Sequence, residues 1–477
     1  MAESTRRRWI GLVFISVAVA LIIVDSTIVN VAVPSIVTEL GITSTEVQWV
    51  QEAYTLVFAS LLLLFGSLAE RGIAFAVWGS TIGGMAAVGP LLGGWLTTEF
   101  SWRWAFGINV PLGIIIVIGV LAFVNESREP SQQRLDLVGA ALSVVTFGAL
   151  VFGLIEGRTY GWWAVNETFT IGSFEWPLPI SPVPVAFAVA ALALVAFIVR
   201  GVTRTRRGES SLLEFSLFRI SSFRNGNIAA LVVALGEFGI ILSLPLWLQF
   251  VLGFDALQTG FVLLALAAGS FVASGFAGAS SGKVSPVVIV RVGILAEIIG
   301  IAWAGFIIAP DAQWGWLIPA LFVYGFGVGL ATAQLTGVVL QDVPVELSGQ
   351  GSGTQSTSRH VGSALGVAIL GTILFTTTGA SLGASLDDAQ LPAEQRDQVV
   401  SAVVDSAGGA IAGLGENPAT ADFAGDAKAA LSDGTRASAF TAAAFLALGL
   451  AATLRLGSGK RADESEGQEP ASSKSSG

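Results

Sequence analysis

Residues 64–79 read LFGSLAERGIAFAVWG, and this stretch decides the fold class. One apolar run, over 47–69, ends inside it, and a second begins at 72 and continues to 96. Only Glu70 and Arg71 separate the two runs. Each run exceeds the ~18 apolar residues that indicate a membrane-spanning helix. The stretch therefore predicts two helices that cross a membrane and a short charged turn between them.

The composition agrees with this prediction over the whole chain. Of 477 residues, 53% are hydrophobic and 12% are charged, and the mean hydropathy is +0.74. Soluble domains carry roughly 25% charged residues, so a soluble protein of this composition could not cover its surface. The apolar runs are continuous rather than alternating, which excludes a membrane β-barrel. We predict an all-α integral membrane protein in a lipid bilayer.

The same criterion predicts about twelve spans, each long enough to cross ~30 Å of hydrocarbon. They lie near residues 9–33, 47–69, 72–96, 104–124, 136–156, 180–200, 227–252, 257–281, 287–309, 314–340, 357–379 and 437–456. The first run has no small-residue cleavage site, so we interpret it as a span rather than a signal peptide.

Lysine and arginine predict the orientation of the spans. With the N-terminus inside, the inner segments hold 19 of the 24 basic residues, and the outer segments hold five. This asymmetry favours both termini in the cytoplasm of a multi-pass cell-membrane protein. The acidic residues concentrate in 380–436 and 460–477 instead of forming a binding face, and we expect no nucleic-acid partner.

Several classes of site are excluded by what the chain lacks. Cysteine is absent, and His360 is the one histidine. These counts exclude disulfides and thiolate metal sites, and they argue against a histidine metal cluster or a Ser-His-Asp triad. We therefore expect no enzyme activity, no cofactor and no metal.

Two long segments between spans leave alternatives open. Residues 201–226 form either a short helix at the inner membrane interface or an ordinary basic loop. Residues 380–436, on the outer side, either hold a small helical cap around 391–412 or are loose. The tail from 460 is rich in Ser, Glu and Gly, which predicts disorder.

Polar residues inside spans are the candidates for function, because ionisable groups in a membrane are rare and usually functional. Asp25 and Asn30 lie in the outer part of the first run, within VDSTIVNVAVP at 24–34. One hypothesis has them hold neighbouring helices together. The other has them carry protons or contact the substrate.

Glu237 lies about ten residues into its run, ~15 Å deep and near mid-membrane. Burial disfavours the charged form of a carboxyl group, which suits a residue that binds and releases protons; the alternative is a packing acid that stays protonated. Glu297 lies at a similar depth in more apolar surroundings. We expect Glu52 and Glu156 to be solvated near the outer ends, and Arg359 to extend its side chain back to the inner interface.

The stretch GSTIGGMAAVGPLLGGW, residues 79–95, indicates a helix that packs closely and bends. Small residues let helices approach backbone to backbone, and proline kinks a helix in the membrane. A packing role and a role in a moving bundle are both open. The residues concerned are Gly79, Gly83, Gly89, Pro90, Gly93 and Gly94.

Segments along nearly all of residues 9–380, and the last span, resemble the fourteen-span drug:proton antiporter branch of the major facilitator superfamily. They are VDSTIVNVAVP at 24–34, GPLLGG at 89–94, SWRWAFGINVPLG at 101–113, RLDLVGAALS at 134–143 and LPLWLQFVLGFDALQTG at 244–260. The resemblance implies six spans, two linking spans and six more. It also implies export of drugs or small metabolites against an inward flow of protons.

The resemblance further implies roles for individual residues. Asp25 matches the membrane acid of the first-span motif, and Arg103 matches the arginine of a Trp-Arg-Trp segment at the outer end of the sixth span. The glycine stretch matches the antiporter motif of the fifth span, with Met85 where a further glycine is usual. The candidate proton and substrate path is then Asp25, Asn30, Arg103, Glu237 and Glu297.

Aligned to this pattern, the chain lacks spans three and four, because 9–69 match spans one and two while 72–96 match span five. Gly66, Glu70 and Arg71 fit the start of the family's loop motif, but 73–75 are apolar where basic residues are usual. The expected units are four spans in 1–126, two linking spans in 127–208, six spans in 209–457 and a tail in 458–477.

The expected function is a proton-coupled secondary transporter that exports small amphipathic or drug-like molecules by alternating access. The alternative is a truncated relative that binds a ligand or partner without a transport cycle. The linking pair either completes a twelve-span bundle or leaves the first half open to lipid. Substrate identity and oligomeric state do not follow from the sequence.

Overall fold

The computed structural model describes residues 2–52, 88–123, 136–207, 212–280, 283–344, 347–389, 391–416 and 420–454. Within them, nine helices are long and apolar enough to cross a membrane, and Thr27–Leu40 is a shorter apolar helix. The charged turn with Gly66, Glu70 and Arg71 lies outside the described residues, as do Gly79 and Gly83. The prediction of an all-α membrane protein is confirmed.

The helices are α1 (Ala2–Leu40), α4 (Arg103–Gly107), α5 (Asn109–Phe123), α6 (Leu137–Tyr160), α7 (Pro182–Arg206), α8 (Ser221–Phe250), α9 (Ala256–Ala279), α10 (Pro286–Ile307), α11 (Leu317–Leu340), α12 (Ser348–Asp388), α13 (Ala393–Asp405), α14 (Ala410–Glu416) and α15 (Ala421–Thr453). Residues 44–52 and 88–99 are also helical. Short 3₁₀ helices cover Phe215–Arg219 and Trp314–Trp316, and the strands β1 (Thr170–Ile171) and β2 (Phe174–Glu175) pair antiparallel.

Local sequence signals set where several helices begin. Asp255 caps α9 through a reciprocal capping box with Gln258. Ser181 caps α7, and Pro182 stands at its first position, where a missing N–H is tolerated. Pro286 likewise stands in the first turn of α10. Helix caps of this kind satisfy backbone groups that the first turn leaves unpaired.

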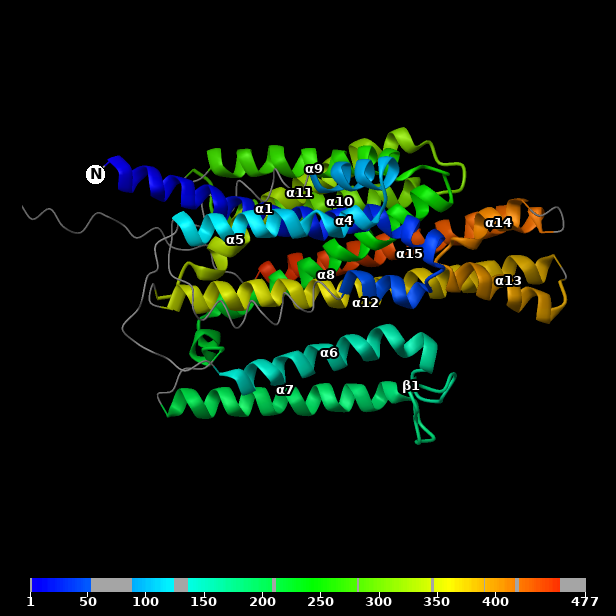
Figure 1. The fold of residues 1–477 in the computed structure, drawn as a ribbon, viewed down its shortest axis with the longest axis horizontal. Helices are drawn as coiled ribbons and strands as arrows, with labels where there is room; N and C mark the ends of the chain where they lie inside the picture. Colours follow the sequence, from blue (N-terminus) through cyan, green and yellow to red (C-terminus); the bar gives the residue numbers. More distant parts are fainter. Residues whose placement is uncertain are drawn as a thin grey trace, which may run out of the picture.

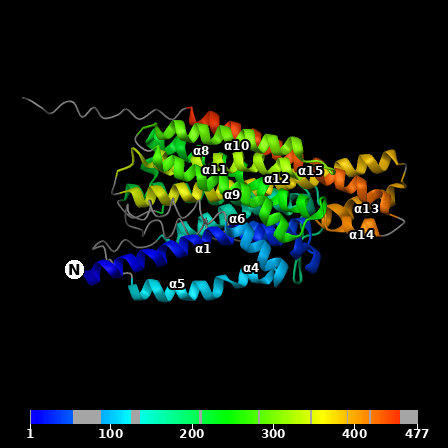
Figure 2. The same ribbon diagram turned by 90° about the horizontal axis from the view of Figure 1, so that it is seen from above.

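The helices form two groups beside one another (Figures 1 and 2). Helices α8, α9, α10, α11, α12 and α15 pack together and make the C-terminal group. Helices α1, α4 and α5 with 44–52 and 88–99 make the N-terminal group, and α1 contacts both α8 and α9. A Cβ atom on Gly325 would lie 1.8 Å from the carbonyl oxygen of Leu266, so glycine is what lets α11 touch α9.

The described residues of the segment 380–436 are largely helical, which decides between the alternatives for it. Helix α12 runs on to Asp388, α13 and α14 follow, and α15 begins at Ala421. Helices α12 and α15 therefore extend beyond the apolar runs at 357–379 and 437–456. Figure 2 shows α13 and α14 beyond the rest of the bundle, and we call this end of the molecule the outer end. In 201–226, α7 extends to Arg206 and a 3₁₀ helix buries Leu217.

The pair α6–α7 lies along one side of the bundle, with α6 between α7 and α12 (Figure 1). Val151 and Ile155 of α6 pack against Ala364 and Ala368 of α12. Trp49 packs against the same cluster, so α6 contacts helix 44–52 as well as α12.

Hydrogen bonds reinforce this contact near the outer end. Trp49 donates from Nε1 to Oε1 of Glu156 at 2.8 Å, and the hydroxyl groups of Thr45 and Thr159 lie 3.1 Å apart. The Arg158 guanidinium lies 5.1 Å from the centre of the Phe375 ring, within cation–π range. Helix α6 therefore touches both groups of helices.

We expect cysteines at Thr45 and Thr159 to form a disulfide in membranes after mild oxidation, because the two hydroxyl groups are in contact. The chain has no other cysteine, so the product is unambiguous. Electrophoresis after digestion at an engineered protease site in 124–135 would show the two fragments joined. A Thr45→Cys/Ser181→Cys pair is the control that should stay unlinked. Fragments that separate in both variants would contradict the position of α6.

Asp136 holds the other end of the α6–α7 pair together. Its carboxylate accepts hydrogen bonds from Arg200 Nε and Gly139 N at 2.9 Å each, and Arg204 lies 3.7 Å away. Burial raises the pKa of Asp136, but the hydrogen bonds from Arg200 and Gly139 and the charges of both arginines outweigh it. The pKa of Asp136 therefore lies below its ordinary value of 3.8.

Asp136→Asn should lower the free energy of unfolding by about 1–2 kcal/mol at neutral pH, because it removes hydrogen bonds to a charged group. A lowered carboxyl pKa stabilises the fold above the unfolded-state value and loses that effect as pH falls through the folded-state value. The difference between variant and parent should thus be full at pH 7 and shrink below pH 3.8. Thermal unfolding in detergent, followed by tryptophan fluorescence, measures both. A difference that grows on acidification would contradict the ion pair.

Candidate functional site

The two groups of helices touch most closely where glycines face backbone. A Cβ atom on Gly94 would lie 2.6 Å from the carbonyl oxygen of Ala256, and one on Gly260 would lie 2.5 Å from that of Pro90. On the other face of helix 88–99, a Cβ atom on Gly93 would lie 2.7 Å from the carbonyl oxygen of Ile28. Helix 88–99 therefore packs between α1 and α9 without room for larger residues.

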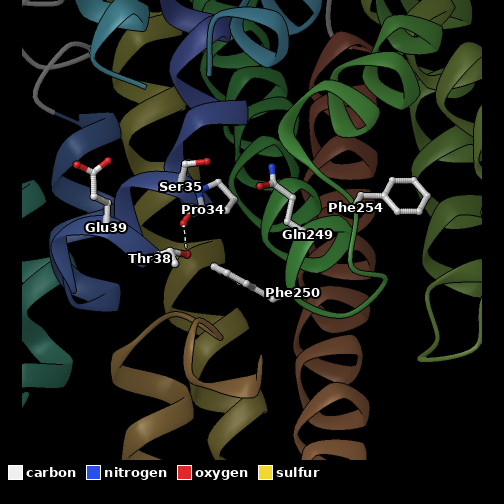
Figure 3. Close-up of a pocket in the computed structure, with 7 residues that line it drawn as sticks. All are labelled: Pro34, Ser35, Thr38, Glu39, Gln249, Phe250 and Phe254. Atoms are coloured by element: carbon white, nitrogen blue, oxygen red, sulfur yellow. Dashed lines mark hydrogen bonds between the residues drawn. The ribbon is translucent and has the colours of Figure 1, made fainter. Parts of the chain in front are cut away.

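A cavity of about 370 Å³ lies at the outer end between α1 and α8. Figure 3 shows Pro34, Ser35, Thr38 and Glu39 on α1 opposite Gln249 and Phe250 on α8, with Phe254 beyond. On the inner side of the cavity, Gln249 donates from Nε2 to the carbonyl oxygen of Val31 at 3.1 Å. This hydrogen bond joins the two groups and closes the inner side of the cavity.

Glu39 of this cavity is held by the segment that follows helix 88–99. It accepts from Arg103 Nη1 and Trp102 Nε1 at 2.7 Å each. These hydrogen bonds, from Arg103 first and then Trp102, hold the pKa of Glu39 below its ordinary value. Arg103 is 57% exposed, so it lies at the outer surface and outside the buried interior.

Asp25 and Asn30 are both buried in α1. Asn109, at the start of α5, donates from Nδ2 to Oδ1 of Asp25. Asp25 therefore joins two helices of the N-terminal group, as the packing hypothesis requires. The same burial also suits a group that exchanges protons.

Glu237 has an ionic partner that comes from another helix. Arg359 Nη2 of α12 lies 3.3 Å from Glu237 Oε2 of α8, and the Glu237 side chain is 5% exposed. The hydroxyl group of Tyr324 donates to the main-chain carbonyl of Glu237 at 3.0 Å. The expectation that Arg359 reaches back to the interface was wrong, because α12 starts at Ser348 and places Arg359 eleven residues inside it.

Glu297 of α10 is fully buried and lies close enough to Glu237 and Arg359 to interact with both electrostatically. Within the described residues, neither carboxyl oxygen has a hydrogen-bond partner. Glycine at 327 permits this position, since a Cβ atom there would lie 2.7 Å from Glu297 Cγ. The C-terminal group thus encloses two acids among apolar helices, with the half-buried Arg359 beside them.

A family model described as the Major Facilitator Superfamily matches residues 69–367. The chain belongs to the major facilitator superfamily. It is 28% identical to a probable actinorhodin transporter of Streptomyces coelicolor, over 80% of this chain and 75% of that protein. It is 31% identical to multidrug resistance protein 3 of Bacillus subtilis, over 64% of this chain and 56% of that protein.

A third relative is puromycin resistance protein pur8 of Streptomyces alboniger, 29% identical over 83% of this chain and 86% of that protein. The chain covers less than two-thirds of some relatives, including multidrug resistance protein Stp of Mycobacterium tuberculosis, of which it covers 60%. Among solved structures, the human organic anion transporter MFSD10 (TETRAN) is 12% identical with a TM-score of 0.45, over 95% of this chain and 89% of that chain. Proteins of the major facilitator superfamily are transporters, in agreement with the expectation of a non-enzyme.

Two acids of this member of the superfamily were expected to be solvated and are not. Glu52 is fully buried, which corrects the expectation that it is solvated. Its two carboxyl oxygens, and both side-chain amide atoms of Gln48 one turn earlier, have no hydrogen-bond partner within the described residues. Counting residues from a loop misjudged Glu52, because its burial depends on how helix 44–52 packs, and Gln48 of this helix contacts α12 at Gly371. Glu156 is half-buried and accepts from Trp49.

The structure of this superfamily member therefore groups the predicted residues in three places. Asp25 and Asn30 lie in α1, Glu237 and Glu297 lie with Arg359 in the C-terminal group, and Arg103 lies at the outer surface. In the described part of the chain, no group of three or more His, Cys, Asp or Glu residues could hold a metal ion.

Proposed function

We propose that this chain is a proton-coupled exporter of small amphipathic or drug-like molecules that works by alternating access. The two groups of helices would rock against each other around a central cargo site. Support for the cargo class comes from the names of relatives, which include antibiotic resistance and multidrug resistance proteins. Protons entering from outside would drive the cycle, at about 2.3 kcal/mol per 100 mV for each charge moved.

The observation that carries the proposal is the ion pair of the buried Glu237 with the half-buried Arg359, with Glu297 beside it. Removing charges from water is unfavourable, so apolar helices rarely enclose them without a function. When Glu237 takes up a proton its attraction to Arg359 ends, and the helices α8 and α12 that carry them are free to shift. Proton binding is thereby linked to the packing of the C-terminal group.

The arrangement corresponds to a state closed at the outer end. Between Ile28 and Val37, α1 is mostly buried against its neighbours, and the Gly94 and Gly260 contacts lie beside this part. Towards its N-terminal end α1 is less covered by protein, with Val13 58% exposed and Val17 39% exposed. In alternating access, the outer contacts would break while the inner ends approach each other.

We also propose that the chain comes from the fourteen-span branch and lacks spans three and four. The family match begins at residue 69, immediately before the two-charge turn. The alignment with the probable actinorhodin transporter extends over 455 residues although only 80% of this 477-residue chain takes part, so that relative carries residues with no counterpart here. Contact of α6 with both groups would let the linking pair complete the bundle.

The proposed units are 1–126, 127–208, 209–457 and 458–477, in a cell membrane with both termini in the cytoplasm. This orientation rests on the 19 basic residues assigned to the inner segments. Sequencing the locus across residues 66–75 would establish the short joint on which the missing spans depend.

The test is transport by purified protein in proteoliposomes loaded with ethidium as the probe cargo, with an imposed pH difference across the membrane. We expect ethidium to move against the proton flow, and to stop when a protonophore removes the pH difference. Liposomes without protein are the control. Ethidium binding without any gradient-dependent movement would overturn the exporter and favour a truncated relative that only binds.

A further inference from the structure

Gln48 and Glu52 face the boundary between the two groups of helices. They are four residues apart on one helix, so they lie on the same face. A Cβ atom on Gly371 of α12 would lie 3.0 Å from Gln48 Cδ and 3.0 Å from Leu242 Cδ2 of α8. Gln48 of the N-terminal group therefore touches the C-terminal group at the depth of Gly371 and Leu242.

The depth of Glu52 follows from this contact. Helix 44–52 runs inward from the outer end, so Glu52 lies ~6 Å further inward than Gln48 at 1.5 Å per residue. Helix α8 runs outward, and Glu237 precedes Leu242 by five residues, which places Glu237 ~7.5 Å inward of Leu242. The two acids thus lie at nearly the same depth, one in each group.

The two acids differ in their partners. Glu237 has Arg359, whereas the Glu52 carboxyl oxygens and the Gln48 amide atoms have no hydrogen-bond partner in the part of the chain that the structure describes. Both side chains are fully buried. A buried polar group without a partner is unfavourable by about 1–3 kcal/mol, and such a group calls for an explanation.

We propose that Glu52 and Gln48 bind the cationic group of the cargo, and that a proton occupies Glu52 when the cargo has left. The proposal rests on the exporter function above and assigns its cargo site in the N-terminal group. A Glu52 carboxylate neutralises the cation, while the Gln48 amide both donates and accepts hydrogen bonds. Each cation bound displaces one proton, so the charge of the site stays constant.

Other charged groups around helix 44–52 are already engaged. On α6, Glu156 accepts from Trp49, and Arg158 donates to Ser44 and lies over Phe375. On α8 and α12, Glu237 pairs with Arg359. On helix 44–52 itself, Glu46 accepts from the main-chain N–H and the hydroxyl group of Thr43. Of the acids named here on the described part of helix 44–52 and on α6, Glu52 is therefore the one whose carboxyl group is open to a new partner.

The structure also indicates how cargo would leave. Gln249 lies seven residues outward of Leu242 on α8, so the outer cavity in Figure 3 lies ~10 Å outward of the Gln48 contact. When the outer contacts open, Gln48 and Glu52 would face this cavity. External protons could then reach Glu52 and release the cation.

The test is ethidium binding to the purified full chain at pH 6, 7 and 8, measured by fluorescence. We expect the affinity of the unaltered protein to rise up to tenfold per pH unit while Glu52 is protonated, because one proton leaves per cation. Glu52→Gln should bind at least tenfold more weakly at pH 8 and show no pH dependence. Glu52→Asp should retain the pH dependence, which separates loss of charge from misfolding.

Glu156→Gln is the matched control, because Glu156 is a nearby acid that already has a partner. It should bind ethidium like the unaltered protein. Unchanged affinity and pH dependence in Glu52→Gln would overturn the proposal, as would failure of ethidium, tetraphenylphosphonium and benzalkonium all to bind the unaltered protein. Cation binding that depends on Glu52 without gradient-driven movement would overturn the exporter function and leave the site standing.

Discussion

Glu237→Gln should abolish the ability of the protein to concentrate cargo against a gradient. A pH difference of one unit corresponds to about 1.4 kcal/mol, so one-for-one exchange with protons sustains about a tenfold cargo gradient per unit. Glutamine has nearly the shape of glutamate but does not bind and release a proton at physiological pH. With a two-unit pH difference, we expect up to a hundredfold accumulation by the parent and none by the variant.

The measurement is ethidium accumulation inside proteoliposomes whose interior is acidic. Protons leave the interior, and ethidium enters in exchange. Because Glu237→Gln leaves Arg359 without its 3.3 Å partner, the variant should also unfold at a lower temperature. A Glu237→Gln/Arg359→Gln double variant removes both charges, so it should recover much of the lost stability without recovering accumulation. Gradient-driven accumulation by Glu237→Gln would show that Glu237 does not couple protons to transport.

Gly260→Val should prevent closure of the outer end and stop transport. A Cβ atom there would lie 2.5 Å from the carbonyl oxygen of Pro90, which is main chain and has little freedom to move. Overpacking of this kind is unfavourable by about 1–3 kcal/mol, and that energy shifts a two-state equilibrium by about 5- to 150-fold. The population should move away from the outward-closed state.

A cysteine placed at Ser35 reports this shift, because Ser35 lines the outer cavity and the chain has no native cysteine. A membrane-impermeant maleimide should label it about tenfold faster or more in the Gly260→Val background, in line with that population shift. Gly275→Val is the control on the same helix, since a Cβ atom there meets nothing within 4 Å. Equal labelling in the two backgrounds would contradict a role for the Gly260 contact in closure.

Asp25 and Glu237 were found from the sequence because a charged residue within an apolar run stands out without any knowledge of its neighbours. Their partners were not found. Arg359 is 122 residues from Glu237 along the chain, and Asn109 is 84 residues from Asp25. Pairing at such separations depends on which helices pack together, and the pattern of apolar residues does not predict that packing.

Glu52 shows the same limit from the opposite direction. Its distance from the nearest loop suggested contact with water, but α12 approaches its helix at Gly371, which lies against Gln48. In the sequence, Gly371 is the residue that indicates a close helix contact here. A single glycine in a chain with 57 of them does not identify its neighbour.

The sequence of each segment, taken alone, determined the class of fold. It also determined the number of apolar runs and the unequal distribution of arginine and lysine. The free energy of transferring a helix into lipid depends mainly on its own side chains, and it is approximately the sum of their separate contributions. The ion pair of Glu237 with Arg359, the contact of Gly260 with Pro90 and the burial of Glu52 needed the packed molecule. Each of them depends on the distance between helices, and that distance is set jointly by side chains from separate parts of the chain.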